Sequence, residues 1–146
     1  FEQGDFQQLI DWIKDEELLI KWSGSLFSFP LTMESLEWYI KNTNEPDISD
    51  AFVFKAVDTV TGNVVGHISL GGLSWKNRSA RITRVLVGNT NEQLKGICQQ
   101  MTKAVLKIGF VLMLSAVFET STSASRTPKS RSANFKMSFL LLIMLP

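Results

Sequence analysis

The stretch that decides the fold is ARITRVLVGNTNEQLKGICQQMTKAVLKIGF, from Ala80 to Phe110. Its first part, Arg81 to Gly88, is rich in β-branched residues and has the length of a strand. Gly88-Asn89-Thr90-Asn91 then has the composition of a turn. We therefore expect a strand, a short polar loop and an amphipathic helix that Gly109 ends. The apolar residues of that helix recur with helical spacing, at Leu94, Ile97, Met101, Ala104, Val105 and Ile108.

The loop before this helix has features of a phosphate-binding site. Gly96 lies in the first turn, where backbone N–H groups lack internal partners and the helix dipole is positive. A glycine there lets an anion approach the backbone closely, and Lys95 adds a positive charge. No acidic residue occurs between Gln93 and Lys107. A plain strand-to-helix connection with an incidental glycine accounts for the same residues, so both interpretations stay open.

The same segment resembles the acetyl-CoA-binding core of the GCN5-related N-acetyltransferases. The signature of that family is a V-x-V strand, a short loop, and Q/R-x-x-G-x-G/A at the start of a helix. Val85-x-Val87 corresponds to the strand and Gln93-x-x-Gly96-x-Cys98 to the loop, with Cys98 in place of the final Gly or Ala. The resemblance implies acetyl-CoA as co-substrate, with the backbone of Val85, Leu86 and Val87 binding its pantetheine arm. It also implies that its pyrophosphate is bound by Gln93, Leu94, Lys95, Gly96, Ile97 and Cys98.

Length and composition narrow the class of protein. With 146 residues, 45% hydrophobic and 20% charged, the chain is suited to one globular domain. A net charge of +1 gives no reason to expect nucleic acid as a partner. A single cysteine cannot form an internal disulfide, which is compatible with a reducing cytoplasm. No apolar run approaches the ~20 residues of a membrane helix, and the first residues do not resemble a signal peptide. We expect a cytoplasmic protein with no membrane partner and no metal.

Helices are predicted in the first part of the chain and strands in the middle. Asp5 suits the N-cap of a helix that reaches about Asp15. Thr32 suits the N-cap of a second helix over Met33–Lys41. Gly62-Asn63 has the chemistry of a hairpin turn. The sequence then predicts an antiparallel meander of three strands, over Ala51–Val57, Val64–Leu70 and Arg81–Gly88.

Three aromatic residues of this N-terminal part are candidate substrate-binding residues. W-x-G at Trp22 to Gly24, followed by P-L-T at Pro30 to Thr32, resembles a bacterial branch of the same family, the ribosomal-protein-alanine acetyltransferases. In that fold the first two helices shape one wall of the acceptor-amine pocket. The resemblance therefore implies a substrate-binding role for Trp22, Phe27 and Trp38. Packing in the core is the competing interpretation for all three.

The family resemblance, which covers residues 5–118, also implies the fold class. It is α+β in three layers, with a mixed, mostly antiparallel central sheet flanked by helices, and residues 1–146 form one acetyltransferase-like domain. Val111–Phe118 is predicted to be the next strand, parallel to Arg81–Gly88 and joined to it by the helix. In the family these two strands splay apart and the thioester enters the gap. We expect the first strand and the C-terminal strands to be incomplete.

Residues 119–146 diverge from the family pattern. Ser121 stands where the family has Asn, and Pro128 stands where it has the Tyr that often protonates the departing thiolate. A reading-frame change in this part is one hypothesis, which a comparison of the three frames of the coding DNA would test. Phe139 to Leu145 is predicted to be either a closing strand or an exposed apolar tail. A chain with an incomplete sheet can pair with a second copy, so we expect a homo-oligomer.

The function implied by the resemblance is N-acetyl transfer from acetyl-CoA to a primary amine of a small molecule or a protein N-terminus. The alternative, favoured by Ser121 and Pro128, is a catalytically inactive module that binds CoA or a protein partner. No residue is identified as the base. Glu119, at the end of a predicted strand, and His67, the only histidine, are the two candidates. Cys98 belongs to no Cys-His motif, so we interpret it as a packed thiol.

Overall fold

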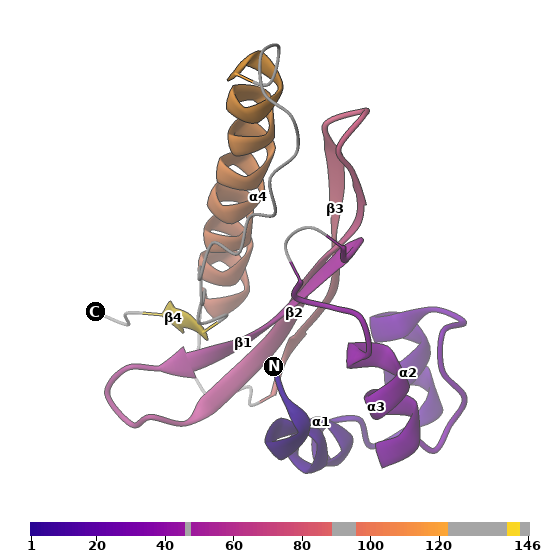
Figure 1. Cartoon of the computed structure of the whole chain (residues 1–146). Coiled ribbons are helices and arrows are strands. Elements are labelled where there is room, and N and C mark those ends of the chain that lie inside the picture. Colours follow the sequence, from indigo (N-terminus) through magenta and orange to yellow (C-terminus); the bar gives the residue numbers. More distant parts are fainter. Residues whose placement is uncertain (46–47, 89–95, 123–139, 144–146) are drawn as a thin grey trace.

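The computed structural model of the chain describes residues 1–45, 48–88, 96–122 and 140–143, with side chains described up to residue 112. Within these ranges the fold is α+β, with helices α1 to α4 and a sheet of three antiparallel strands joined by a parallel fourth. Figure 1 shows α4 against one face of the sheet and α1, α2 and α3 against the other. The predicted α+β class, with helices on both sides of a mostly antiparallel sheet, is confirmed.

Three short helices form the layer on one face. After a 3-10 turn at Gln3–Asp5, α1 spans Phe6–Trp12, α2 spans Glu16–Ser23 and α3 spans Met33–Ile40. The predicted cap of α3 is confirmed, because the Thr32 hydroxyl accepts a hydrogen bond from the Ser35 N–H at 3.3 Å. The single helix expected from Asp5 to Asp15 is wrong. Asp5 occupies the predicted N-cap position of α1, but its carboxylate accepts the Glu2 N–H at 2.9 Å in the capping box of the 3-10 turn, and the helix ends at Trp12. Asp15 then caps α2.

The sheet has the strand order β3-β2-β1-β4. β1 (Ala51–Asp58) pairs antiparallel with β2 (Val64–Ser74), and β2 pairs antiparallel with β3 (Ser79–Val87). The predicted meander of three strands is therefore confirmed. β4 (Leu140–Ile143) pairs with the other edge of β1 and runs parallel to it. The predicted closing strand is therefore observed for Leu140–Ile143, and the other residues of the run Phe139 to Leu145 lie outside the described residues.

A β-bulge interrupts the pairing of β3 with β2. His67 is opposite Leu86 and Ser69 is opposite Thr83, so Arg84 and Val85 together face the single residue Ile68. Arg84 has φ +52°, in the left-handed region that residues with a Cβ rarely adopt. Bulges bend a strand and turn a side chain away from its regular direction. The bulge therefore sets where the Arg84 side chain lies.

Helix α4 spans Ile97–Thr122 and carries the predicted apolar stripe. Ile97, Met101 and Val105 are fully buried against the sheet. α4 also approaches β2 closely, because a Cβ added at Gly66 would lie 2.7 Å from the Met101 sulfur. Within the described ranges, no helix has both the length and the apolar character needed to cross a membrane.

The predicted end of this helix at Gly109 and the predicted strand Val111–Phe118 are wrong. α4 continues without a break through Gly109, whose φ is not positive, and includes residues 111–118. A short apolar run does not by itself distinguish a strand from a buried helical segment. Leu, Met and Ala in this run are good helix formers, and Leu112 packs against the same core as the preceding turns. The two splayed parallel strands expected from the resemblance are therefore not formed by these residues.

Candidate functional site

The bulge in β3 is held in place by two side chains from elsewhere in the fold. The Arg84 carbonyl oxygen accepts a hydrogen bond from Trp22 Nε1 at 3.0 Å and a second from His67 Nδ1 at 2.9 Å. The carbonyl can only accept, so the proton of His67 is on Nδ1. A left-handed conformation costs a residue such as Arg about 1–2 kcal/mol, which the two bonds offset. Strained residues fixed by their surroundings cluster at functional sites.

His67 is enclosed by aromatic rings and has no exposed surface. The rings of Phe1, Trp22 and Tyr39 have centroids 4.8, 5.3 and 6.0 Å from the imidazole. This burial lowers the pKa of His67 to about 4, although the bond to the Arg84 carbonyl acts in the opposite direction. Its Nε2 has no hydrogen-bond partner within the described part of the chain. A buried, neutral imidazole held against the bulge suits a positioning role better than the catalytic base that the sequence suggested.

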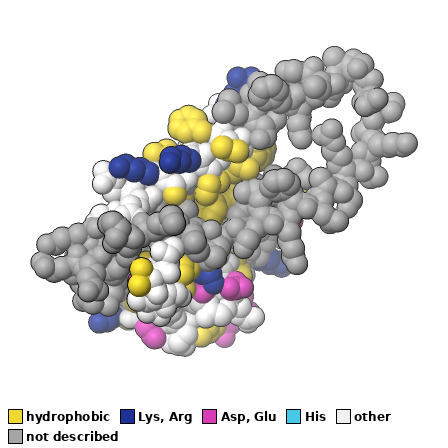
Figure 2. All heavy atoms as spheres, turned by 90° about the vertical axis from the view of Figure 1, so that its left-hand side faces the viewer, with side chains coloured by type: hydrophobic (Ala, Val, Ile, Leu, Met, Phe, Trp, Pro, Cys, Tyr) yellow, Lys and Arg dark blue, Asp and Glu magenta, His cyan; other side chains and the backbone are white. Residues whose placement is uncertain are grey.

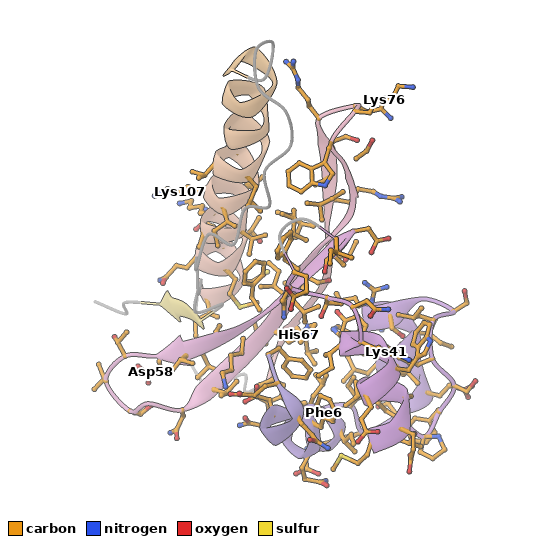
Figure 3. All side chains as sticks on the ribbon, viewed as in Figure 1. Phe6, Lys41, Asp58, His67, Lys76 and Lys107 are labelled. Atoms are coloured by element: carbon orange, nitrogen blue, oxygen red, sulfur yellow. The ribbon has the colours of Figure 1, made fainter. Side chains whose placement is uncertain are left out.

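A cavity of about 560 Å³ opens next to the bulge. It lies between the end of α3, the start of β1 and the Gly71-Gly72 segment of β2, and its volume is within the range of small-molecule sites. Figure 3 shows Lys41, which follows α3 and lines the cavity, to the right of His67. The charged lining residues are Lys41, Asp50 and Arg84, and Leu26, Trp38 and Tyr39 supply rings and apolar surface.

Of the three aromatic residues predicted to bind substrate, one lines the cavity. Trp38 lines it and is 61% exposed. Trp22 is 5% exposed and stacks on Phe27, with ring centroids 5.7 Å apart and planes 12° apart. Trp22 is therefore a core residue and the partly buried Phe27 packs against the same core, in agreement with the competing interpretation. Trp22 also holds the bulge, which the spacing of aromatic residues could not indicate.

Tyr39 and Arg84 are site residues that the sequence analysis missed. The Arg84 guanidinium lies over the Tyr39 ring, 5.1 Å from its centroid. Burial raises the pKa of Tyr39, while the neighbouring Ser69 hydroxyl and Arg84 guanidinium offset part of that shift. An arginine directly before the apolar run Val85–Val87 is the signal that could have pointed to this site.

The residues predicted to bind the pantetheine arm lie on an edge strand. β3 is the last strand of the sheet, so its outer backbone edge has no neighbouring strand within the described ranges. Val85 and Val87 pack against the core under α4, whereas Leu86 packs against the core under α1 to α3. The backbone of Val85–Val87 therefore presents N–H and C=O groups at an edge that begins at the bulge.

The residues predicted to bind the pyrophosphate are only partly within the described ranges. Gln93, Leu94 and Lys95 lie outside them. Gly96 directly precedes α4, has φ +88°, and its carbonyl accepts the Gln100 N–H at 3.0 Å. Among the described residues, no atom lies within 4 Å of a Cβ added at Gly96. Ile97 is fully buried and Cys98 is exposed, which makes the prediction of a packed thiol wrong.

The candidate base Glu119 lies in the helix and not at the end of a strand. Its side chain is outside the described part of the structure, and Ser121 is in the same helix. Pro128 lies outside the described ranges altogether. Within those ranges no group of three His, Cys, Asp or Glu residues could hold a metal ion. The structure therefore gives no new support to a general base in this helix.

No family model matches this sequence, and no curated protein matches it significantly. The resemblance to the N-acetyltransferases therefore remains a prediction from the motifs of the chain. What the structure adds is the arrangement of an edge strand, a bulge, a helix start and a cavity.

Proposed function

We propose that this domain binds acetyl-CoA as co-substrate and transfers its acetyl group to a primary amine held in the cavity. The observation that carries the proposal is the bulge at Arg84, which joins the open edge of β3 to the cavity. The pantetheine arm would follow the backbone of Val85–Val87, and the pyrophosphate would lie at the start of α4 beside Gly96. The acceptor amine would be a small molecule or a protein N-terminus.

The chemistry of the transfer is direct attack. The neutral amine forms a C–N bond with the thioester carbonyl carbon, the C–S bond breaks, and the CoA thiolate leaves. Backbone N–H groups of β3 would stabilise the oxyanion that forms on the carbonyl oxygen. Among the described residues, Asp50 is the carboxylate that lines the cavity. Asp50 is exposed to solvent, which can accept the proton that the amine loses.

A second candidate function is a catalytically inactive module that binds CoA or a protein partner. The observation that favours it is the inclusion of residues 111–118 in α4. In the family that the chain resembles, a strand at this point forms the second wall of the thioester gap. Without that wall, CoA could bind along β3 while its thioester remained too loosely held for efficient transfer.

Melting curves and thiol release distinguish these candidates. We expect CoA to raise the melting temperature, and acetyl-CoA to release free thiol when amines and N-terminal peptides are added. The variant Gly96→Ala should lose the stabilisation by CoA, because Cβ is strained at φ +88°. Gly62→Ala is the matched control, since Gly62 has φ +73° in a turn of the β1–β2 hairpin. Stabilisation without thiol release supports the inactive module, and the absence of both removes the cofactor.

A homo-oligomer and a cytoplasmic location remain part of the proposal. Leu106 and Phe110 of α4 are 45% and 68% exposed, and Figure 2 shows hydrophobic side chains gathered beside Lys and Arg on this side of the molecule. Exposed apolar residues next to each other are typical of interaction surfaces. Light scattering on the wild type and on Phe110→Ser tests the oligomer. A monomeric wild type would remove that part of the proposal.

A further inference from the structure

The molecule has two regions of opposite charge. The helical layer, residues 1–45, contains nine Asp and Glu residues against three Lys, a side-chain charge of −6. The β2–β3 hairpin and the turn before it, residues 59–88, contain four Lys and Arg residues and no Asp or Glu. Figure 2 shows the Asp and Glu side chains of that view in the lower part of the molecule. A net charge of +1 for the whole chain therefore does not exclude a strong local charge of either sign.

The charges of both regions are exposed and for the most part unpaired. Lys76, Arg78 and Arg81 of the β2–β3 hairpin are exposed, and none of them forms an ion pair within the described part of the chain. The same holds for five carboxylates of the helical layer, which are those of Asp11, Asp15, Glu16, Glu34 and Glu37. Each region therefore keeps an excess of charge that a partner of opposite charge can compensate.

The two regions lie toward opposite ends of the molecule. Figure 3 shows Lys76 at the tip of the hairpin and Phe6, in α1, at the other end. Figure 1 shows that the upper part of the hairpin extends beyond α2 and α3. Within one copy the charges at the tip therefore lie apart from those of the helices. Two copies placed side by side and antiparallel would bring each hairpin to the helical layer of the other, so that the same contact occurs twice about a two-fold axis.

Exposed apolar residues accompany the charges in both regions. Trp75, in the turn of the β2–β3 hairpin, is 37% exposed. Ile20 of α2 is 56% exposed and Met33 of α3 is 38% exposed. Exposed ion pairs are individually weak, whereas buried aromatic anchors contribute much of the binding energy of an interface. Trp75 of one copy, placed against these apolar residues of the other, can supply such an anchor.

We propose that the partner of both regions is a second copy of this chain, in an antiparallel pair in which the hairpin of each copy contacts the helical layer of the other. A nucleic acid would fit the hairpin alone and would be repelled by the helical layer, whereas a second copy compensates both regions at once. The inference deepens the proposed homo-oligomer and rests on it, but it does not rest on acetyl transfer. The contact is also separate from the exposed apolar residues of α4.

The test reverses the charge of each region in turn. Lys76→Glu with Arg78→Asp reverses the hairpin, and Asp is chosen because it tolerates the φ of +51° at Arg78. Asp11→Lys with Glu37→Lys reverses part of the helical layer at positions away from the helix starts, where Lys would oppose the helix dipole. Sedimentation velocity then measures the association of each double variant alone and of their equimolar mixture.

The expected result is a loss of association that the mixture restores. Each double variant alone should associate at least about tenfold more weakly than the wild type, because both contacts of the pair then join like charges. The mixture should return to within about threefold of the wild type, because both contacts again join opposite charges. Lys103→Glu with Lys107→Glu is the matched control, since it reverses two exposed charges of α4 outside both regions and should change little.

Salt gives a second measurement that needs no variant. Because salt screens exposed charges, association of the wild type should weaken at least about tenfold between about 50 mM and about 500 mM NaCl. Association that salt does not weaken, a mixture no stronger than its components, or an equal loss in the α4 control would overturn this inference alone. A wild type that stays monomeric at about 100 μM and low salt would overturn it together with the proposed homo-oligomer. Acetyl transfer is tested separately, by CoA in the melting experiment.

Discussion

The two faces of the sheet differ in the kind of residue that they bury. Under α4 the core cluster is built from apolar residues, among them Phe52, Ile68 and Met101. Under α1 to α3 the same strands bury His67 and Ser69, and the neighbouring layer adds Tyr39 and the indole N–H of Trp22. The face under α4 holds the fold by area and close packing. On the opposite face some of the buried groups are polar, and these groups hold Arg84 beside a cavity.

This difference indicates where function lies. Polar groups inside a core are expensive, and a sequence that needed only stability would use apolar residues on both faces. The bulge, the strained Arg84 and the unpaired hydroxyl of Tyr39 all lie on the side of the short helices. On the side of α4, by contrast, the cofactor is proposed to bind at the outer edge of β3 and at Gly96. The two sides meet at the bulge.

Removing a large side chain from the face under α4 should have the largest effect on stability. Phe52 is fully buried, so we expect Phe52→Ala to lower the free energy of unfolding by about 3–5 kcal/mol. Trp38→Ala on the other side should lower it by less than about 1 kcal/mol, because Trp38 is 61% exposed, while weakening acceptor binding. Denaturant unfolding measures both. Similar losses in the two variants would contradict the division between the faces.

Acid should destabilise the polar face through His67. Its folded pKa of about 4 lies below the ordinary value of 6.5, so the unfolded chain binds the proton first as the pH falls. The contribution of His67 to the free energy of unfolding is complete above about pH 6.5. It is lost between about pH 6.5 and about pH 4, and the total loss is roughly 3 kcal/mol. His67→Gln should show a shallower dependence of unfolding free energy on pH in this window. An unchanged slope would mean that His67 is not buried as a neutral group.

The support of the bulge can be tested by removing one hydrogen bond. Trp22→Phe keeps an aromatic ring but leaves the Arg84 carbonyl with only the bond from His67. We expect a loss of about 1–3 kcal/mol in unfolding free energy, together with weaker acceptor binding. Trp75→Phe, in the partly exposed β2–β3 hairpin, is the control and should change little. Loss of stability with full acceptor binding would separate the bulge from the site.

The smallest predicted effect tests whether α4 is continuous through Gly109. Gly109 is inside the helix, where Ala is favoured over Gly by about 0.5–1 kcal/mol. A Cβ added there would lie 3.4 Å from a Leu70 methyl group, an ordinary contact. Gly109→Ala should therefore raise the unfolding free energy by up to about 1 kcal/mol in a denaturation experiment. A clear decrease would favour the helix end that the sequence predicted at this residue.

Local sequence patterns predicted most of the fold, but they failed where tertiary contacts determine the local structure. The Thr32 cap, the three-strand meander and the stripe from Ile97 to Ile108 depend on spacing and turn chemistry, which the sequence displays directly. Residues 111–118 were misassigned because their apolar run suits a strand or a buried helix equally. The sequence placed an arginine at position 84 beside an apolar run, but it could not show the bulge, because a bulge arises from the pairing of two strands.

The most direct test of the central claim is the map of amide resonances that move when CoA is added to the whole chain. Cofactor bound along the open edge of β3 and at the start of α4 should shift Val85, Leu86, Val87, Gly96 and Cys98. Residues in the centre of β1, such as Phe54, should shift little. Shifts confined to other parts of the chain, or no shifts with CoA, would contradict the claim.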